Sequence, residues 1–176
     1  MEQVILVNEM DVELGLMEKM EAHAKALLHR AFSVFVFNKN GEMLLQQRAI
    51  TKYHSGGLWT NTCCSHPRPG ETILQAANRR LKEEMGFETA LIKVLDFIYK
   101  APFSNGLTEH EFDHVLVGYY DGIIYPNQEE VEKYSFNSLA DIELQINQCP
   151  EIYTEWFKIA FPLIKNWWQE NNKNNV

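Results

Sequence analysis

The sequence is short of cysteine, and its three cysteines, Cys63, Cys64 and Cys149, are an odd number. Two of them are neighbours in the chain, and a disulfide between adjacent cysteines is strained. A disulfide framework of the kind that holds small secreted domains together is therefore not expected. The cysteines are predicted to be free thiols in a reducing compartment.

The sequence also lacks long apolar runs and an excess of positive charge. No apolar stretch approaches the roughly 20 residues that a membrane helix needs, and the first residues, MEQVILVNEMD, lack the basic and apolar regions of a signal peptide. The 24 Asp and Glu residues outnumber the 16 Lys and Arg residues, and the resulting net charge of −8 repels nucleic acids and anionic membranes. We therefore expect a cytoplasmic protein with no nucleic-acid or membrane partner. The sequence does not determine the oligomeric state, for which the expectation is a monomer or weak homodimer. An anionic substrate would need a local cluster of cations.

The sequence contains enough apolar material for one packed domain. It has 176 residues, of which 45% are hydrophobic and 12% aromatic, and it shows no internal repeat. The last residues are rich in Asn, and 171–176 are predicted to be a polar tail. A single domain spanning residues 1–176 is the expected organisation.

Hydrophobic periodicity and turn residues predict strands that alternate with helices. The segment at 11–15 is predicted to be a turn or a strand, and Gly86 is predicted to end a helix. The turn KNG joins two strands into a hairpin. Strands are predicted at 3–8, 31–38, 42–48, 89–101, 110–122 and 130–139, and helices at 16–29, 71–87, 138–148 and 151–170. The pattern predicts an α/β (α+β) fold, an α/β/α sandwich with a mixed sheet.

The helix predicted at 71–87 carries charged residues at a distinctive spacing. Arg79 and Glu83 are four residues apart and can pair on one face, whereas Glu84 is turned about 100° away and is free to point at a cation. A solvated charged helix would also explain this spacing. The pattern resembles the Nudix box, Gx5Ex7REUxEExGU, a loop–helix–loop that binds Mg²⁺ and a diphosphate. Its matching residues are Glu71, Arg79, Leu81, Glu83, Glu84, Gly86 and Phe87.

Two positions depart from that box. Ser65 stands at its first Gly, and Arg80 replaces the Glu of its RE pair. The second exchange removes a carboxylate that could bind Mg²⁺ and adds a cation that favours phosphate. The resemblance therefore predicts a Nudix-like fold that holds a diphosphate without hydrolysing it.

Three histidines and two glutamates form a second group of interest. Side chains alternate along a strand, so Glu109 and Glu111 share one face and repel each other unless a proton or cation lies between them. With His23, His29 and His66 they make a donor set suited to Zn²⁺, Mn²⁺, Fe²⁺ or Mg²⁺. An ideal helix would turn His23 and His29 about 240° apart. If both bind one ion, the helix predicted at 16–29 must end before His29.

Each histidine alone could instead be an ordinary surface or core residue. His54, His110 and His114 have no such context in the sequence and receive no predicted role.

Six segments, taken in order over roughly residues 3–165, resemble the type 1 isopentenyl diphosphate isomerases. They are KMEAHAKALLHRAFSVFVFN, QQRAITKYHSGGLWTNTCCSHPRPGE, AANRRLKEEMGF, FIYKAPF, EHEFD and YTEWF. The string TNxCxSHP together with the carboxylate pair ExE is far more specific than the Nudix box alone. This family interconverts isopentenyl diphosphate and dimethylallyl diphosphate.

The resemblance implies catalytic roles for four residues. Cys64 matches the catalytic cysteine and Glu111 the catalytic glutamate. Tyr99 matches the tyrosine that hydrogen-bonds this glutamate, and Trp156 matches the aromatic residue that covers the reacting carbons. In an extended segment Cys63 would face away from the site, and we expect it to be a small buried residue.

The resemblance also implies two sets of ligands. The first set holds one tight divalent ion, Mn²⁺, Mg²⁺ or Zn²⁺, and consists of His23, His29, His66, Glu109 and Glu111. Glu84 matches the acidic residue that reaches a second Mg²⁺ bound with the substrate. The cations that match the diphosphate-binding set, and that would supply the local positive charge, are Lys19, Arg48, Lys52 and Arg80.

The implied reaction moves a double bond. The alkene is protonated at its terminal carbon and loses a proton from C2, with a tertiary carbocation or something close to it between the two steps. Two proton-bearing groups on opposite faces of the substrate suffice, and the family precedent favours Glu111 as donor and the Cys64 thiolate as acceptor. The Trp156 indole would stabilise the cation by roughly 0.5–2 kcal/mol. Water must be excluded from such a cation, and the C-terminal helix that carries Trp156 is a candidate lid.

Two other functions remain open from the sequence. A Nudix hydrolase of a nucleoside diphosphate derivative would share the fold, but Arg80 argues against it. A metal-binding module without catalysis would not need Cys64, Glu111, Tyr99 and Trp156 together.

Overall fold

The computed structural model describes residues 2–52, 54–103 and 105–172. Its strands are β1 (Gln3–Val7), β2 (Glu13–Glu18), β3 (His29–Phe37), β4 (Met43–Arg48), β5 (Trp59–Thr60), β6 (Cys63–Ser65), β7 (Leu91–Pro102), β8 (Thr108–Tyr119) and β9 (Val131–Asn137). Its helices are α1 (Lys19–Ala24), α2 (Ile73–Met85), α3 (Leu139–Gln148) and α4 (Glu155–Asn171), with a 3₁₀ turn at Pro150–Ile152.

The strands form one mixed sheet organised around β3. Along its whole length β3 runs parallel to β8, from His29 beside Glu111 to Phe37 beside Tyr119. On its other side β3 pairs with β1, β6 and β4, all antiparallel. The long strand β7 pairs antiparallel with β8, and β9 pairs with β4. The predicted mixed sheet is confirmed.

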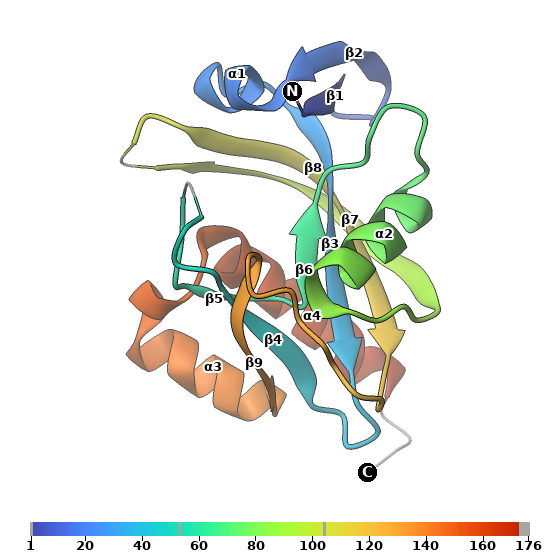
Figure 1. The fold of residues 1–176 in the computed structure, drawn as a ribbon, viewed down its shortest axis with the longest axis vertical. Helices are drawn as coiled ribbons and strands as arrows, with labels where there is room; N and C mark the ends of the chain where they lie inside the picture. Colours follow the sequence, from blue (N-terminus) through green and yellow to red (C-terminus); the bar gives the residue numbers. More distant parts are fainter. Residues whose placement is uncertain (1, 53, 104, 173–176) are drawn as a thin grey trace.

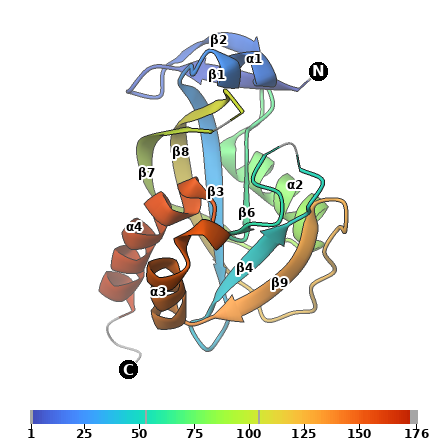
Figure 2. The same ribbon diagram turned by 90° about the vertical axis from the view of Figure 1, so that its left-hand side faces the viewer.

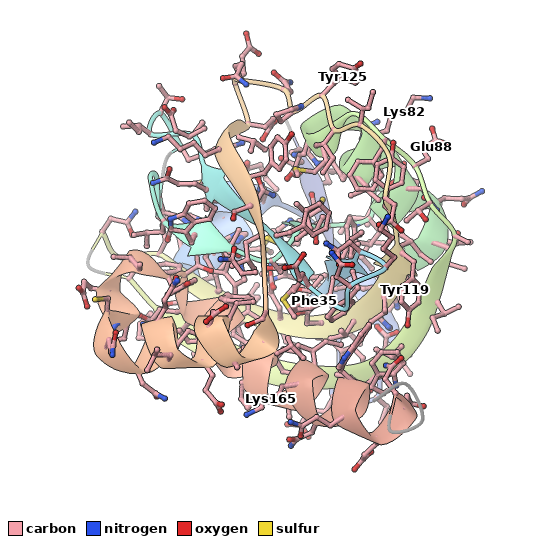
Figure 3. All side chains as sticks on the ribbon, turned by 90° about the horizontal axis from the view of Figure 1, so that it is seen from below. Phe35, Lys82, Glu88, Tyr119, Tyr125 and Lys165 are labelled. Atoms are coloured by element: carbon pink, nitrogen blue, oxygen red, sulfur yellow. The ribbon has the colours of Figure 1, made fainter. Side chains whose placement is uncertain are left out.

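Helices cover both faces of this sheet because the side chains of β3 alternate. Val34 and Val36 pack against α2, whereas Phe35 and Phe37 pack toward α3 and α4. Figure 2 shows α2 on one side of the sheet and α3 with α4 on the other. Figure 3 shows Phe35 near the middle of the molecule, and burying this side chain contributes roughly 1.5–3 kcal/mol. The predicted α/β/α layering is thus confirmed.

Local signals in the sequence fix both ends of α2. At its start the Thr72 side chain accepts from the Gln75 backbone and the Gln75 side chain accepts from the Thr72 backbone, which forms a capping box. At its end Gly86 has a φ of 77°, and a Cβ there would lie 2.3 Å from the Tyr125 carbonyl oxygen. Only glycine fits this position, so the prediction that Gly86 ends the helix is correct.

Two predicted helices are shorter in the structure. The helix predicted at 16–29 is confined to Lys19–Ala24, because residues 16–18 pair with β1 and Ala26 takes a left-handed φ of 52°. The helix predicted at 151–170 begins only at Glu155, after the 3₁₀ turn. Strand pairing and a local turn override the helical composition in these segments.

The N-terminal segment and the last helix lie at the two ends of the described chain. The β1–β2 hairpin and α1 lie over one end of the sheet (Figure 1). The predicted polar tail at 171–176 falls mainly outside the described residues, and Asn171 is the last residue of α4. Within the described part of the chain, no helix is long and apolar enough to cross a membrane.

Candidate active site

A cavity of about 240 Å³ lies beside β8, where the side chains on one face of this strand change from apolar to acidic. Val117 and Val115 belong to the core beneath α4, and three carboxylates continue the same face of the strand toward its start: Asp113, Glu111 and Glu109. The predicted residues that line the cavity are Lys19, Arg48, Lys52, Cys64, His66, Arg80, Glu84, Tyr99, Glu109, Glu111 and Trp156. His23 and His29 are fully buried.

Five donor atoms converge beside this cavity. One atom each of His23, His29, His66, Glu109 and Glu111 lies within 4.8 Å of all the others. The His29 and His66 Nε2 atoms are 3.2 Å apart, and the Glu111 Oε1 atom is 2.8 Å from His66 Nε2. The elements α1, β3 and β8, with the residue after β6, supply these donors, and the parallel register of β3 and β8 sets His29 beside Glu111. This buried cluster is compatible with a divalent metal.

Backbone carbonyl groups on the side away from the cluster fix the ring orientation of His23 and His29. The Nδ1 atom of His23 lies 2.6 Å from the Lys19 carbonyl oxygen, and the Nδ1 atom of His29 lies 2.8 Å from the Leu27 carbonyl oxygen. A carbonyl can only accept, so both Nδ1 atoms carry the hydrogen and donate. Both Nε2 atoms are thereby left to face the cluster, which is the arrangement that metal-binding histidines favour.

The electrostatics of the cluster also fit a cation. Burial alone would raise the pKa of Glu109, but hydrogen bonds from His23 and His54 hold that pKa well below its ordinary value. Burial and the neighbouring Glu109 both raise the pKa of Glu111, yet His29 and His66 bring it below its ordinary value. Burial lowers the pKa of His66. The carboxylates are ionised and need positive charge nearby, which either protons on the imidazoles or a metal would provide.

His66→Ala is predicted to lose the tightly held metal. Removing one ligand should weaken binding by at least about a hundredfold, since even residues behind the ligands contribute 10–100-fold. The measurement is metal content per chain after purification without chelator. The control is His110→Ala, because His110 lies on the opposite face of β8 with its Nδ1 atom 2.9 Å from the Ala26 carbonyl oxygen. Equal metal content in both variants would contradict the ligand set.

The predicted catalytic pair faces the same space. Tyr99 is the register partner of Glu111 in the β7–β8 ladder, and its hydroxyl donates to Glu111 Oε2 at 2.6 Å. Cys64 pairs with Ser33 of β3 and lines the cavity, whereas its neighbour Cys63 is fully buried against α2. Burial raises the pKa of the Cys64 thiol. The predicted opposite orientations of the two cysteines are therefore confirmed.

Trp156 lies in the first turn of α4 and is 4% exposed. Its indole Nε1 donates to Thr60 Oγ1 at 2.8 Å, and the Thr154 hydroxyl donates to the same oxygen at 3.0 Å. The Thr154 backbone also donates to the Trp59 carbonyl oxygen. These bonds tie the start of α4 to β5, so a movement of this helix as a lid would have to break them, and the lid stays a prediction. The guanidinium of Arg48 lies 5.2 Å from the Trp156 ring centroid.

The four predicted diphosphate cations come together, but not as a purely positive cluster. Lys19 pairs with Glu2 at 3.2 Å, and Lys52 pairs with Glu130. The lining contains four such cations and five carboxylates, a balance of −1 before any histidine is counted. An incoming diphosphate must therefore compete with carboxylates or bind together with divalent cations, as the expected second Mg²⁺ would allow.

The acidic residue of α2 is held in place rather than free. Glu84 Oε1 accepts from Arg80 at 2.6 Å and Oε2 accepts from Gln46 at 2.7 Å. Glu84 thus already contacts a cation of the chain itself, Arg80, and its role as a ligand of a second Mg²⁺ stays a prediction. The predicted contact of Arg79 with Glu83 is present at 3.3 Å.

Sequence analysis missed several residues that shape this site. Thr60 anchors Trp156, Gln46 holds Glu84, and Glu130 lies 3.4 Å from Arg80. His54, to which no role was assigned, has its Nε2 atom 3.1 Å from Glu109 Oε1. In the structure the segment TNT in front of the cysteines is fully buried and each of its side chains is hydrogen-bonded, but three polar residues give no sign of this burial in the sequence.

Comparison with known proteins identifies the family of the chain. Residues 27–157 match the model of the NUDIX domain family. The chain is 50% identical over 167 residues to isopentenyl-diphosphate Delta-isomerase of Pectobacterium atrosepticum, covering 95% of this chain and 93% of that protein. It is 52% identical over 171 residues to isopentenyl-diphosphate Delta-isomerase of Photobacterium profundum, covering 94% and 95%. In fold it resembles the MutT protein of Methanosarcina mazei, with a TM-score of 0.64, 19% identity, and coverage of 82% of this chain and 95% of the other. The chain therefore belongs to the NUDIX family and, within it, to the isopentenyl-diphosphate Delta-isomerases.

Proposed function

We propose that the protein interconverts isopentenyl diphosphate and dimethylallyl diphosphate. The observation that carries the proposal is that Cys64 and Glu111 line one small cavity together with four cations. A thiol and a carboxyl group can add a proton to one carbon and remove a proton from another, and neither needs water to attack. The relatives that share about half of their residues with this chain carry the name of the same activity.

The double-bond shift balances with two proton transfers. In the forward direction the protonated Glu111 gives its proton to the terminal carbon, and the developing positive charge lies on the tertiary carbon. The Cys64 thiolate then takes a proton from C2, and the electrons of that C–H bond form the new double bond. The enzyme ends with a carboxylate and a thiol, so the same groups run the reverse reaction with roles exchanged.

The surroundings of the two groups control where the proton resides. Burial disfavours a thiolate at Cys64, and the imidazoles beside Glu111 lower the pKa of its carboxyl group. In the metal-free protein the thiol and the carboxylate are therefore the favoured pair. The Tyr99 hydroxyl, 2.6 Å from Glu111, keeps the carboxyl group oriented in either state.

The tight metal site is formed by His23, His29, His66, Glu109 and Glu111, a set of nitrogen and oxygen donors that suits Mn²⁺, Mg²⁺ or Zn²⁺. The His29 and His66 nitrogens, 3.2 Å apart, cannot both face this point without a proton or cation between them. When bound, such an ion supplies positive charge that fixes the position and the proton affinity of the carboxylate.

The diphosphate serves as an anchor and does no chemistry. Lys19, Arg48, Lys52 and Arg80 line the cavity, and a second Mg²⁺ held by Glu84 would offset the carboxylates among them. The resulting binding energy positions the five-carbon chain between the catalytic groups.

The cavity size and the altered Nudix box weigh against hydrolysis of a nucleotide. The cavity of about 240 Å³ is smaller than the roughly 300–1,000 Å³ typical of pockets for drug-sized ligands. Arg80 stands where a hydrolase of this family would have a metal-binding glutamate, and it pairs with Glu84. A small isoprenoid diphosphate fits both observations.

The test is incubation with isopentenyl diphosphate, Mg²⁺ and Mn²⁺ in deuterated water, followed by NMR. We expect dimethylallyl diphosphate to form and both five-carbon diphosphates to acquire deuterium from solvent. Phosphate release from nucleoside diphosphate derivatives is measured in parallel. Phosphate release without deuterium exchange would favour the hydrolase, and neither reaction with metal bound would favour a non-catalytic module.

A further inference from the structure

His54 lies against the outer oxygen of a predicted metal ligand. This residue belongs to the loop between β4 and β5, is 9% exposed, and lines the cavity. Its Nε2 atom is 3.1 Å from Glu109 Oε1. The other oxygen of the same carboxylate, Oε2, is 2.8 Å from His23 Nε2 within the donor cluster. Glu109 is therefore held from two sides, with only one of its oxygens turned toward the cluster.

Aromatic neighbours fix the imidazole in this orientation. The ring of His54 stacks on Phe103 with centroids 4.9 Å apart and an interplanar angle of 15°. It also meets the Trp156 ring edge-on at 5.7 Å and 80°. Phe103 comes directly after β7 and Trp156 belongs to α4, so two distant segments hold one loop side chain.

The second ring nitrogen determines which proton is available. The Nδ1 atom of His54 lies 3.3 Å from Ser55 Oγ, whose hydroxyl can donate to it. The ring hydrogen is then on Nε2, the nitrogen that lies 3.1 Å from Glu109 Oε1. A carboxylate whose outer oxygen accepts this hydrogen can direct its other oxygen to a metal in a fixed geometry.

We propose that His54 is a positioning residue of the metal site: its Nε2–H holds the outer oxygen of Glu109 so that the inner oxygen binds the ion. The inference rests on the proposed function only in that it uses the same metal site. His54 is not one of the five donors of the cluster. It acts through Glu109, and the stack on Phe103 keeps it in reach.

Two variants separate the donor from the ring. His54→Gln keeps an N–H donor on a side chain of similar reach but loses the aromatic ring. His54→Phe keeps the ring against Phe103 but has no donor. The dissociation constant for Mn²⁺ alone is measured without substrate, by titrating metal-free full-length protein against a competing chelator. His110→Phe is the matched control on the other face of β8.

We expect His54→Phe to weaken Mn²⁺ binding by about 10–100-fold, His54→Gln by less than about threefold, and His110→Phe not at all. At limiting Mn²⁺ the isomerase activity of His54→Phe should fall, and excess Mn²⁺ should restore kcat. A general packing defect would not weaken Mn²⁺ binding more in His54→Phe, which lacks the N–H donor, than in His54→Gln, which keeps it.

Equal weakening in the Gln and Phe variants would overturn the donor role, and so would wild-type affinity in the Phe variant. Failure of the wild-type protein to bind Mn²⁺ would overturn the inference together with the metal site. If the wild-type protein binds Mn²⁺ but isomerises nothing, the proposed function fails while the pattern of affinities still decides the role of His54.

Discussion

Cys64→Ala is expected to abolish isomerisation, a loss of roughly 10⁴-fold, which is the upper end of what one proton-transfer group contributes. Cys64 is the only described residue of β6 that brings a thiol to the cavity, since the other lining residue, Ser65, carries only a hydroxyl group. The reaction requires a base at C2 in one direction and an acid there in the other, so a methyl group serves neither direction. Turnover of isopentenyl diphosphate measures the loss, and metal content and thermal unfolding show whether the site and fold survive.

Cys63→Ala is the matched control for this prediction. Cys63 is adjacent in the chain, but its side chain is buried in the core beneath α2 and away from the cavity. Losing its sulfur should lower the free energy of unfolding by about 1 kcal/mol and leave turnover within about threefold. Normal turnover in Cys64→Ala, or an equal loss in both variants, would remove Cys64 from its role.

Glu111→Gln is expected to be as damaging, because the amide has the same shape but cannot carry the catalytic proton. Tyr99 could still donate to the amide oxygen, so the fold should be kept. One metal ligand loses its charge, and Mn²⁺ binding should weaken as well. The assay is therefore run at rising Mn²⁺ concentration. Recovery of turnover at high Mn²⁺ would mean that Glu111 is needed only as a ligand.

Asp113→Asn is the control for the second prediction. Asp113 is two residues along the same face of β8 and accepts from the Ser33 hydroxyl at 2.7 Å. Burial and the neighbouring Glu111 raise the pKa of this carboxyl group well above its usual range. A neutral carboxyl group resembles an amide, so turnover should change little. A loss equal to that of Glu111→Gln would show that the whole acidic row, rather than one residue, carries the effect.

The sequence predicts well those parts of the site that depend on local alternation. The two-residue period places Glu109 and Glu111 on one face and turns Cys63 and Cys64 apart, as the structure has them. The capping box and Gly86 fix α2 in the same local way. These features need only neighbours in the chain, which a single sequence contains.

Features that depend on distant segments could not be predicted in this way. The short α1 results from the pairing of residues 16–18 with β1, and no local signal announces that pairing. His54 acquires its position from Phe103 and Trp156, and Thr60 becomes an anchor only because α4 begins beside it. Without these contacts His54 has the sequence signature of an ordinary loop residue. The number of carboxylates that face the four cations in the cavity could not be predicted either. Two of them, Glu2 and Glu130, come from segments far from the recognised motifs.

The donor cluster draws on four separate stretches of the chain, and two of its members, His23 and Glu109, are 86 positions apart. An ion bound there would act as a cross-link that fastens the N-terminal hairpin and α1 to the central strands. Since such an ion binds the folded chain and finds no preformed site in the unfolded one, its binding energy adds directly to stability. After the ion is removed with a chelator, proteases should cleave within about the first 25 residues before they cleave the rest of the sheet. The same ion would then support both the reaction and the stability of the N-terminal segment.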